Sequence, residues 1–193
     1  MTAATYADLV AHPDDVKSEV LGGELVTQPS ATFGHCYVRS GLGRLLGGPF
    51  DFDDDGPGGW YIVTTDLDVR FTDHDIVRAD GIGWLRPRLD GRYDSLPIDV
   101  VPDWICEVLS PSSTKRDRLH KFQLYARHGV PHYWLVDPEA RLLEAYALVG
   151  GGWKSIGVYD ETARVRIAPF EAIELPVGHL FLPEPENPAP AAT

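Results

Sequence analysis

The sequence contains no apolar run approaching the roughly 20 residues that a helix needs to span a bilayer. Its first residues, MTAATYADLVAHPDD, also lack the basic segment and the long apolar stretch of a secretory signal. These two absences argue against insertion in a membrane and against export. We therefore expect a cytoplasmic protein that has no membrane partner.

Cysteine and basic residues are both scarce. The two cysteines, Cys36 and Cys106, show no CxxC spacing, and their apolar neighbours predict free, buried thiols in a reducing compartment. The 17 Lys and Arg residues face 29 Asp and Glu, which gives a net charge of −12. This balance argues against broad affinity for polyanions but permits a local basic strip, for which KRDRLHK (115–121) is one candidate.

Familiar ligand-binding motifs are absent or incomplete. The segment 51–56 begins like a calcium loop, but Ile62 stands where the twelfth position requires Glu, so we expect an acidic loop. His128 and His132 have the spacing of helical metal ligands, but Gly and Pro lie between them and prevent a regular helix. Neither segment predicts a metal site.

The remaining pattern alternates short β runs with a few helical stretches. We expect helices at 5–11, 32–46 and 113–127, and strands at 18–27 (a hairpin turning at 22–23), 60–65, 67–71, 76–84, 104–109, 133–136, 141–148, 153–159 and 165–167. Residues 47–59 and 86–102 have the composition of loops. This order predicts one domain (1–182) on the border of α/β and α+β, with a mixed β-sheet flanked by helices, an N-terminal hairpin and a C-terminal antiparallel meander. The Pro- and Ala-rich segment 183–193 is expected to be a disordered tail.

One strand, Trp104–Leu109, contains a single carboxylate in an otherwise apolar run. Because strand residues alternate faces, Ile105, Glu107 and Leu109 should share one face, and Trp104, Cys106 and Val108 the other. A carboxylate buried in such a strand needs a cation, a proton or a metal, since burying it unpaired is costly. Glu107 is therefore the first candidate for function.

A second acid, Asp80, lies near the end of the apolar run at 76–84 and is followed by Gly81, which allows the chain to turn. If the two strands are neighbours, Asp80 and Glu107 can converge. Mg²⁺ is commonly bound by one or two carboxylates together with waters and phosphate oxygens. This pair therefore predicts a sparse magnesium site.

The helix expected after Glu107 opens with Thr114-x-x-Asp117, which resembles a capping box. Lys121 lies one turn after Asp117 and one turn before Tyr125. Spacing alone leaves two interpretations open. Asp117 and Lys121 could form a surface pair worth about 0.3–0.5 kcal/mol, or Lys121 could join Asp80 and Glu107 in one site.

The strings DWICEVLSPSS and DRLHKFQLYARHGVPHYWLVDP resemble the Uma2 family of restriction endonuclease-like proteins, formerly a domain of unknown function, within the PD-(D/E)xK nuclease superfamily. The resemblance extends from SEVLGGELV through RADGIGW to the meander. It implies a restriction endonuclease-like core in which Asp80, Glu107 and the main-chain carbonyl of Val108 hold Mg²⁺, with Mn²⁺ as a substitute.

The sequence departs from the superfamily pattern at two positions. Ala79 replaces the proline of the PD pair, and Leu109 occupies the place of the strand lysine. The resemblance implies that Lys121, on the following helix, supplies this charge. It also implies an accessory acid in the hairpin, which Glu19 or Glu24 could provide; Glu19 is the predicted site residue, with His35 and Tyr125 as further candidates of structural or supporting role.

The activity implied is metal-dependent endonucleolytic hydrolysis of DNA by Asp80, Glu107, Lys121 and Glu19. The alternatives are a nuclease fold that has lost catalysis and serves as a binding module, or a metal-dependent hydrolase with a substrate other than DNA. Exposed β runs near Trp153 and Tyr159 indicate either a homodimer surface or strand edges within one domain.

Overall fold

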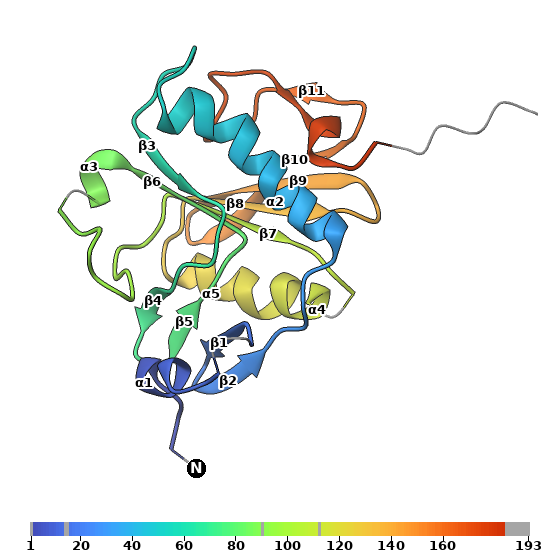
Figure 1. Cartoon of the computed structure of the whole chain (residues 1–193). Helices are drawn as coiled ribbons and strands as arrows, with labels where there is room; N and C mark the ends of the chain where they lie inside the picture. The colour runs from blue at the N-terminus through green and yellow to red at the C-terminus, as the bar shows by residue number, and fades with distance from the viewer. Residues whose placement is uncertain (1, 14–15, 90, 112, 184–193) are drawn as a thin grey trace, which may run out of the picture.

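The computed structural model describes residues 2–13, 16–89, 91–111 and 113–183 (Figure 1). A six-stranded sheet has the order β10-β9-β8-β7-β6-β3. Its strands are β3 (Trp60–Val63), β6 (Gly81–Leu85), β7 (Trp104–Val108), β8 (His132–Asp137), β9 (Leu142–Val149) and β10 (Gly152–Asp160). β7 and β8 pair in parallel, whereas the other neighbours are antiparallel, so the sheet is mixed as predicted.

A smaller antiparallel sheet has the order β2-β1-β5-β4, with short helix α1 (Tyr6–Val10) beside it. It contains β1 (Ser18–Leu21), β2 (Glu24–Thr27), β4 (Val69–Thr72) and β5 (Asp75–Val77). The predicted hairpin is confirmed, because Gly22 and Gly23 adopt positive φ angles of 58° and 79° between β1 and β2. The single strand expected at 76–84 is wrong: the run divides into β5 and β6, which belong to different sheets.

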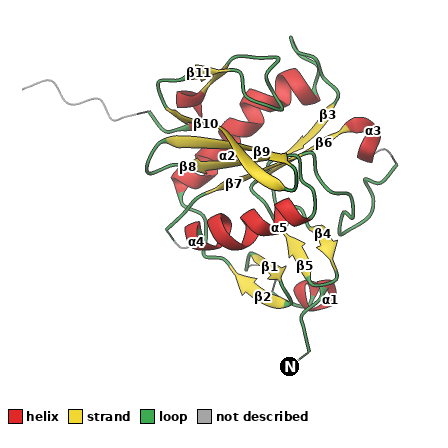
Figure 2. Cartoon of the chain, turned by 180° about the vertical axis from the view of Figure 1, so that it is seen from behind, coloured by secondary structure: helices red, strands yellow, loops and turns green. Residues whose placement is uncertain are grey.

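Helices cover both faces of the large sheet (Figures 1 and 2). α2 (Phe33–Leu46) packs on one face and begins at Thr32, whose side chain accepts a hydrogen bond from His35 N–H. On the other face lie α4 (Thr114–Arg116), the π-turn η2 (Asp117–Lys121) and α5 (Phe122–Arg127). This second helical layer lies between the two sheets.

The alternation predicted for β7 is confirmed by two separate hydrophobic clusters. Trp104, Cys106 and Val108 pack in the cluster that contains the apolar side of α2. Ile105 and Leu109 pack in the cluster that contains α5 and the strands of the small sheet. Each layer of helix is therefore anchored by one face of the same strand.

Several local expectations need correction. Residues 47–59 are not all loop, because the π-turn η1 (Gly47–Asp51) continues α2, and a short helix α3 (Arg86–Leu89) lies in the expected connection 86–102. The run at 165–167 does not join the meander, which β8, β9 and β10 form; instead β11 (Arg164–Val165) pairs with β12 (Leu175–Pro176), followed by the 3₁₀ helix η3 (Val177–Leu180). These pairings depend on long-range packing rather than on local pattern.

Two further expectations concern exposure and the termini. Both cysteines are free, but Cys36 is exposed rather than buried. The expected tail lies outside the described residues from 184 onward. Within the described part of the chain, no helix is long and apolar enough to cross a membrane.

Candidate active site

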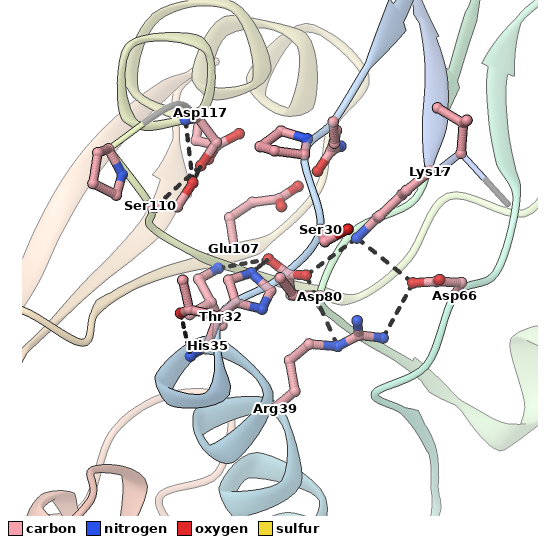
Figure 3. A pocket seen from close by; sticks show the side chains of 17 residues that line it. Lys17, Ser30, Thr32, His35, Arg39, Asp66, Asp80, Glu107, Ser110 and Asp117 are labelled. Atoms are coloured by element: carbon pink, nitrogen blue, oxygen red, sulfur yellow. Dashed lines mark hydrogen bonds and ion pairs between the residues drawn. The ribbon is translucent and has the colours of Figure 1, made fainter.

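A cleft of about 600 Å³ opens where the hairpin, the start of α2, the end of β7 and the π-turn η2 meet (Figure 3). Its size lies within the range of small-ligand sites. The residues lining it include Lys17, His35, Arg39, Asp66, Asp80, Glu107, Val108 and Asp117. Chemically active side chains from segments far apart in sequence therefore share one cavity.

Asp80 lies in the link Arg78–Asp80 that joins β5 to β6. Its Oδ2 accepts hydrogen bonds from Val108 N–H at 2.9 Å and from His35 Nε2 at 3.2 Å, and its Oδ1 lies 3.3 Å from Lys17 Nζ. Burial alone would raise the pKa of Asp80, but the His35 hydrogen bond and the Lys17 charge outweigh it and hold the pKa below its ordinary range. Asp80 is therefore an ionised carboxylate at neutral pH.

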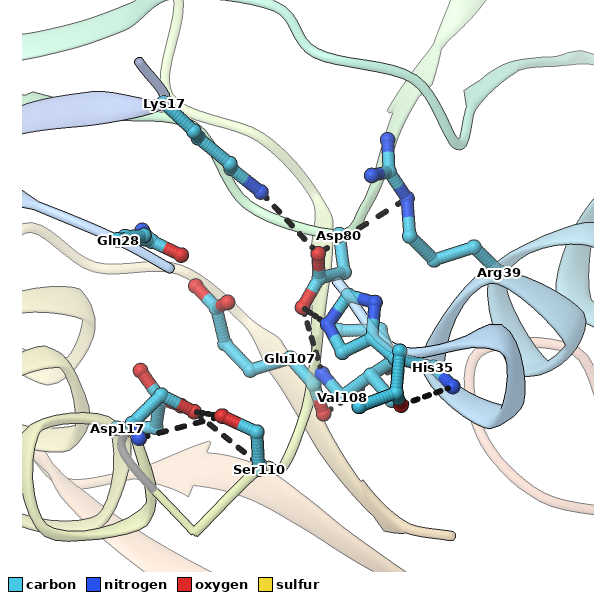
Figure 4. A network of polar contacts seen from close by, with 12 residues as sticks. Lys17, Gln28, His35, Arg39, Asp80, Glu107, Val108, Ser110 and Asp117 are labelled. Carbon is cyan, nitrogen blue, oxygen red and sulfur yellow. Dashed lines mark hydrogen bonds and ion pairs between the residues drawn. The ribbon is translucent and has the colours of Figure 1, made fainter. Parts of the chain in front are cut away.

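Glu107 lies in the centre of the buried strand β7 and turns toward the helical layer. Its Oε1 accepts hydrogen bonds from Lys121 Nζ at 2.9 Å and from Tyr125 O–H at 2.5 Å. Burial raises the pKa of Glu107 to about 8; Lys121 opposes this increase, while the neighbouring carboxylates add to it. Figure 4 shows the Glu107 carboxylate extending into the space between Gln28 and Asp80.

The structure distinguishes the two acids of the hairpin. Glu19 is fully buried, and its Oε1 lies 2.7 Å from Lys121 Nζ and accepts Arg78 N–H at 2.8 Å. Its Oε2 accepts Gln28 Nε2 at 2.5 Å. Glu24, the rival candidate, is exposed at the far end of the hairpin. Glu19 therefore has the contacts of a residue that holds Lys121 in place.

The interpretation of Asp117 and Lys121 as a surface pair is wrong. The Lys121 side chain is 1% exposed and Asp117 is 2% exposed. Lys121 Nζ lies within 4 Å of three carboxylates, those of Glu19, Glu107 and Asp117. Although burial opposes the charged form, these carboxylates raise the pKa of Lys121, so the ammonium stays charged.

The expected capping box does not form either. The helix begins at Thr114, whose hydroxyl donates to Ser110 C=O at 2.7 Å, and the N-cap residue is Ser113, which makes no side-chain cap. Asp117 instead begins the π-turn η2, in which the chain takes up one more residue per turn than in an α-helix. This wider turn lets Asp117, Lys121 and Tyr125 all face inward, toward the strand that carries Glu107.

Lys121 does not reach both acids of the predicted metal pair. Among the described residues it forms ion pairs with Glu107, Glu19 and Asp117, whereas the cations near Asp80 are Lys17 and Arg39. Sequence reasoning did not identify Lys17, Arg39 and Asp66 as part of the cleft. No motif marks them, because they come from the segment before β1, the middle of α2 and a loop.

The cleft contains an excess of buried negative charge. Three carboxylates surround Lys121, and Arg116 lies 3.8 Å from one of them, Asp117. These groups leave a net charge of −1 when all are ionised. The Oδ1 of Asp117 is buried without a hydrogen-bond partner, and burial raises the pKa of this residue. Such an arrangement favours either protons or an added cation.

The donor set fits a sparsely liganded Mg²⁺. Asp80 and Glu107 offer carboxylate oxygens, and the Val108 N–H that binds Asp80 shows which edge of β7 the Val108 carbonyl also faces. Within the described residues no three His, Cys, Asp or Glu side chains converge as a metal cluster. Asp80 and Glu107 are the candidate ligands, and Mg²⁺ commonly takes one or two carboxylates and completes its shell with water and phosphate.

A mixed six-stranded sheet with helices on both faces defines an α/β protein. The family model described as "Uma2: Putative restriction endonuclease" matches residues 3–178, and the chain belongs to this family.

The crystal structure of a protein from Anabaena variabilis ATCC 29413, described as "a putative nuclease belonging to DUF820", shares the fold. It superposes with a TM-score of 0.69 at 19% identity, covering 91% of this chain and 96% of that one. No protein of curated function matches the sequence.

Proposed function

We propose that this protein is a Mg²⁺-dependent endonuclease that hydrolyses phosphodiester bonds in DNA. The observation that carries the proposal is the position of Lys121, whose ammonium lies 2.9 Å from Glu107 Oε1 although Leu109 occupies the usual lysine position on the strand. A helical side chain thus supplies a cation beside the strand acid. Membership of a family whose model is described as "Putative restriction endonuclease" supports the reaction class.

Each residue of the site would have its own role in this reaction. Asp80 and Glu107, with the Val108 carbonyl, would hold the divalent cation, which lowers the pKa of a bound water and polarises the phosphate. Lys121 would orient the attacking water or stabilise negative charge that develops on the phosphate. Glu19 would position Lys121, and Tyr125 would fix the Glu107 carboxylate through its 2.5 Å hydrogen bond.

Plasmid cleavage in Mg²⁺ or Mn²⁺ tests this function. We expect Glu107→Gln to reduce the cleavage rate at least about 100-fold, since it removes a charge that holds the cation. Glu24→Gln is the matched control on the exposed part of the hairpin and should cleave as wild type does. Equal rates for Glu107→Gln and wild type would remove Glu107 from the mechanism.

A second candidate is a nuclease fold that binds without cleaving. It is favoured by one observation: Glu19 and Glu107 lie 2.7 and 2.9 Å from the buried Lys121 ammonium and engage two of its three donors within the protein. Calorimetric titration with Mg²⁺ separates the two, because a dead module should show no binding that depends on Asp80 and Glu107.

A further inference from the structure

Lys17 and Arg39 form a basic wall of the cleft, and the proposed reaction does not use it. Lys17 Nζ lies 3.3 Å from Asp80 Oδ1 and 3.5 Å from Asp66 Oδ1. Arg39 Nη2 lies 3.2 Å from Asp66 Oδ1, and its Nε lies 3.9 Å from Asp80 Oδ1. Figure 3 shows the two cations reaching the same pair of carboxylates from different elements.

Lys17 and Arg39 together supply more positive charge than the Asp80 carboxylate requires. Asp80 already accepts hydrogen bonds from Val108 N–H and His35, so one further cation would satisfy it. Lys17 and Arg39 are nevertheless held at the cleft with only 19% and 16% of their side chains exposed, which costs hydration. The acid that shares them, Asp66, is 51% exposed and lies on the cleft lining.

The rest of the helix carries the same sign of charge. α2 contains Arg39 and Arg44 but no acidic residue, in a chain whose net charge is −12. An ammonium and a guanidinium that face a cavity together form a typical site for a phosphate group. The α2 side of the cleft therefore presents cations, in a chain that is acidic as a whole.

We propose that Lys17 and Arg39 bind a backbone phosphate of the DNA substrate, and that Asp66 occupies them until the phosphate arrives. The inference rests on the proposed function, whose substrate it positions. A divalent cation on Asp80 would neutralise the carboxylate that attracts both side chains. Cation binding and phosphate binding therefore strengthen one another.

The role of Asp66 gives the proposal a distinctive consequence. Because Asp66 competes with the phosphate for both cations, Asp66→Asn should bind DNA more tightly than wild type does. A general loss of structure cannot produce this gain. A purely structural role for Lys17 and Arg39, as partners of Asp80, predicts no more than the small gain from removing one negative charge near DNA.

The experiment measures fluorescence anisotropy of a labelled DNA duplex in Ca²⁺ buffer over a series of salt concentrations. We expect Lys17→Gln and Arg39→Gln each to weaken binding about tenfold and to reduce the slope of log affinity against log salt by about 1. Arg44→Gln is the matched control: it is exposed on the same helix, over the Tyr37 ring, and should change neither quantity. Asp66→Asn should tighten binding.

Unchanged salt slopes in both Lys17→Gln and Arg39→Gln would overturn the inference, as would weaker binding by Asp66→Asn. Its failure is distinct from failure of the proposed function. A wild-type protein that cleaves DNA while the slopes stay unchanged refutes only the basic wall. A protein that shows the slope changes but cleaves nothing in Mg²⁺ or Mn²⁺ refutes only the hydrolysis.

Discussion

At the scale of single residues, Lys121 and its three carboxylates form one electrostatic unit. Glu19 and Glu107 lie 2.7 and 2.9 Å from the ammonium, so the lysine neutralises groups on both sheets. Removing one partner from a buried charge group leaves the others unpaired, which costs more than the pair itself contributes.

Lys121→Met should therefore destabilise the protein by about 3–5 kcal/mol, because it leaves buried carboxylates without their cation. Urea unfolding followed by tryptophan fluorescence measures this loss. Lys115→Met, an exposed lysine of the same helical layer, is the control and should change stability by less than about 0.5 kcal/mol. Comparable stability of the two variants would contradict the buried ammonium.

Glu107 predicts how stability depends on pH. Its pKa is about 8 in the fold, above its ordinary value, so between pH 5 and pH 8 the folded protein holds a proton that the unfolded chain releases. The free energy of unfolding should fall as pH rises through this window, by an amount on the order of a few kcal/mol. Asp80 changes the free energy of unfolding only in acid, because its lowered pKa keeps it ionised throughout this pH window.

Urea unfolding at pH 5.5 and pH 8.5 in EDTA checks this expectation. Glu107→Gln should flatten the dependence, since it carries no ionisable group. The raised pKa of Asp117 acts in the same direction and leaves a smaller residual slope. A wild-type protein that becomes more stable across this window would contradict the raised pKa of Glu107.

At the scale of elements, the π-turn η2 places Lys121 beside Glu107, although Leu109 and not a lysine follows Glu107 on the same face of the strand. Deleting Leu119, which is 50% exposed, should convert η2 to an ordinary helical turn and rotate Asp117 away from the cleft. We expect cleavage to fall at least about 100-fold, while far-UV circular dichroism keeps its helical signal. Leu119→Ala, which removes the side chain but not the turn, should cleave normally.

Some elements of the fold could be predicted from the sequence, and others could not. The alternation of Trp104–Leu109 and the Gly22-Gly23 hairpin could be predicted, because each is a local pattern. The resemblance also indicated that Lys121 lies near Glu107, as it does; its role as the displaced cation stays a prediction. The interruption between β5 and β6 at Arg78–Asp80 could not be predicted. The residues on both sides are apolar, and the two strands differ only in the sheet to which they belong. The β11–β12 pairing was missed for the same reason.

The basic wall was missed on different grounds. Lys17 and Arg39 belong to elements whose relative position depends on the packing of the whole fold. The π-turn was also invisible, since Asp117-x-x-x-Lys121 has the spacing of an ordinary helical pair. Local pattern thus located the acids and the lysine, whereas tertiary packing determined what surrounds them.

At the scale of the whole molecule, the site joins two sheets. Glu19 belongs to the small sheet and Glu107 to the large one, with Lys121 between them. A cation bound by Asp80 and Glu107 would stabilise the folded state by about 2.7 kcal/mol at 100 times its dissociation constant. For a chain of this length, Tm should rise by about 5–10 °C.

Differential scanning fluorimetry with and without Mg²⁺ measures this shift, and Asp80→Asn should abolish it. Glu24→Gln, on the exposed end of the hairpin, should retain it. An equal shift in wild type and Asp80→Asn would mean that Mg²⁺ stabilises the protein elsewhere. The exposed β runs left a homodimer surface and strand edges equally open, and a homodimer stays a prediction. β10 is the edge strand of the large sheet and exposes Val158, and Val149 is exposed at the end of β9.

The link Arg78–Asp80 has a consequence for how related sequences can vary. Its first residue donates a backbone hydrogen bond to Glu19 and its last accepts one from Val108, so the link is fixed to the site at both ends. Three residues span at most about 10 Å, so an inserted or deleted residue would displace one of these two contacts. Insertions and deletions among homologues should therefore be absent from this link and collect in surface loops such as 52–59. An alignment that tolerates length changes between β5 and β6 would mean that the acid can be placed in another way.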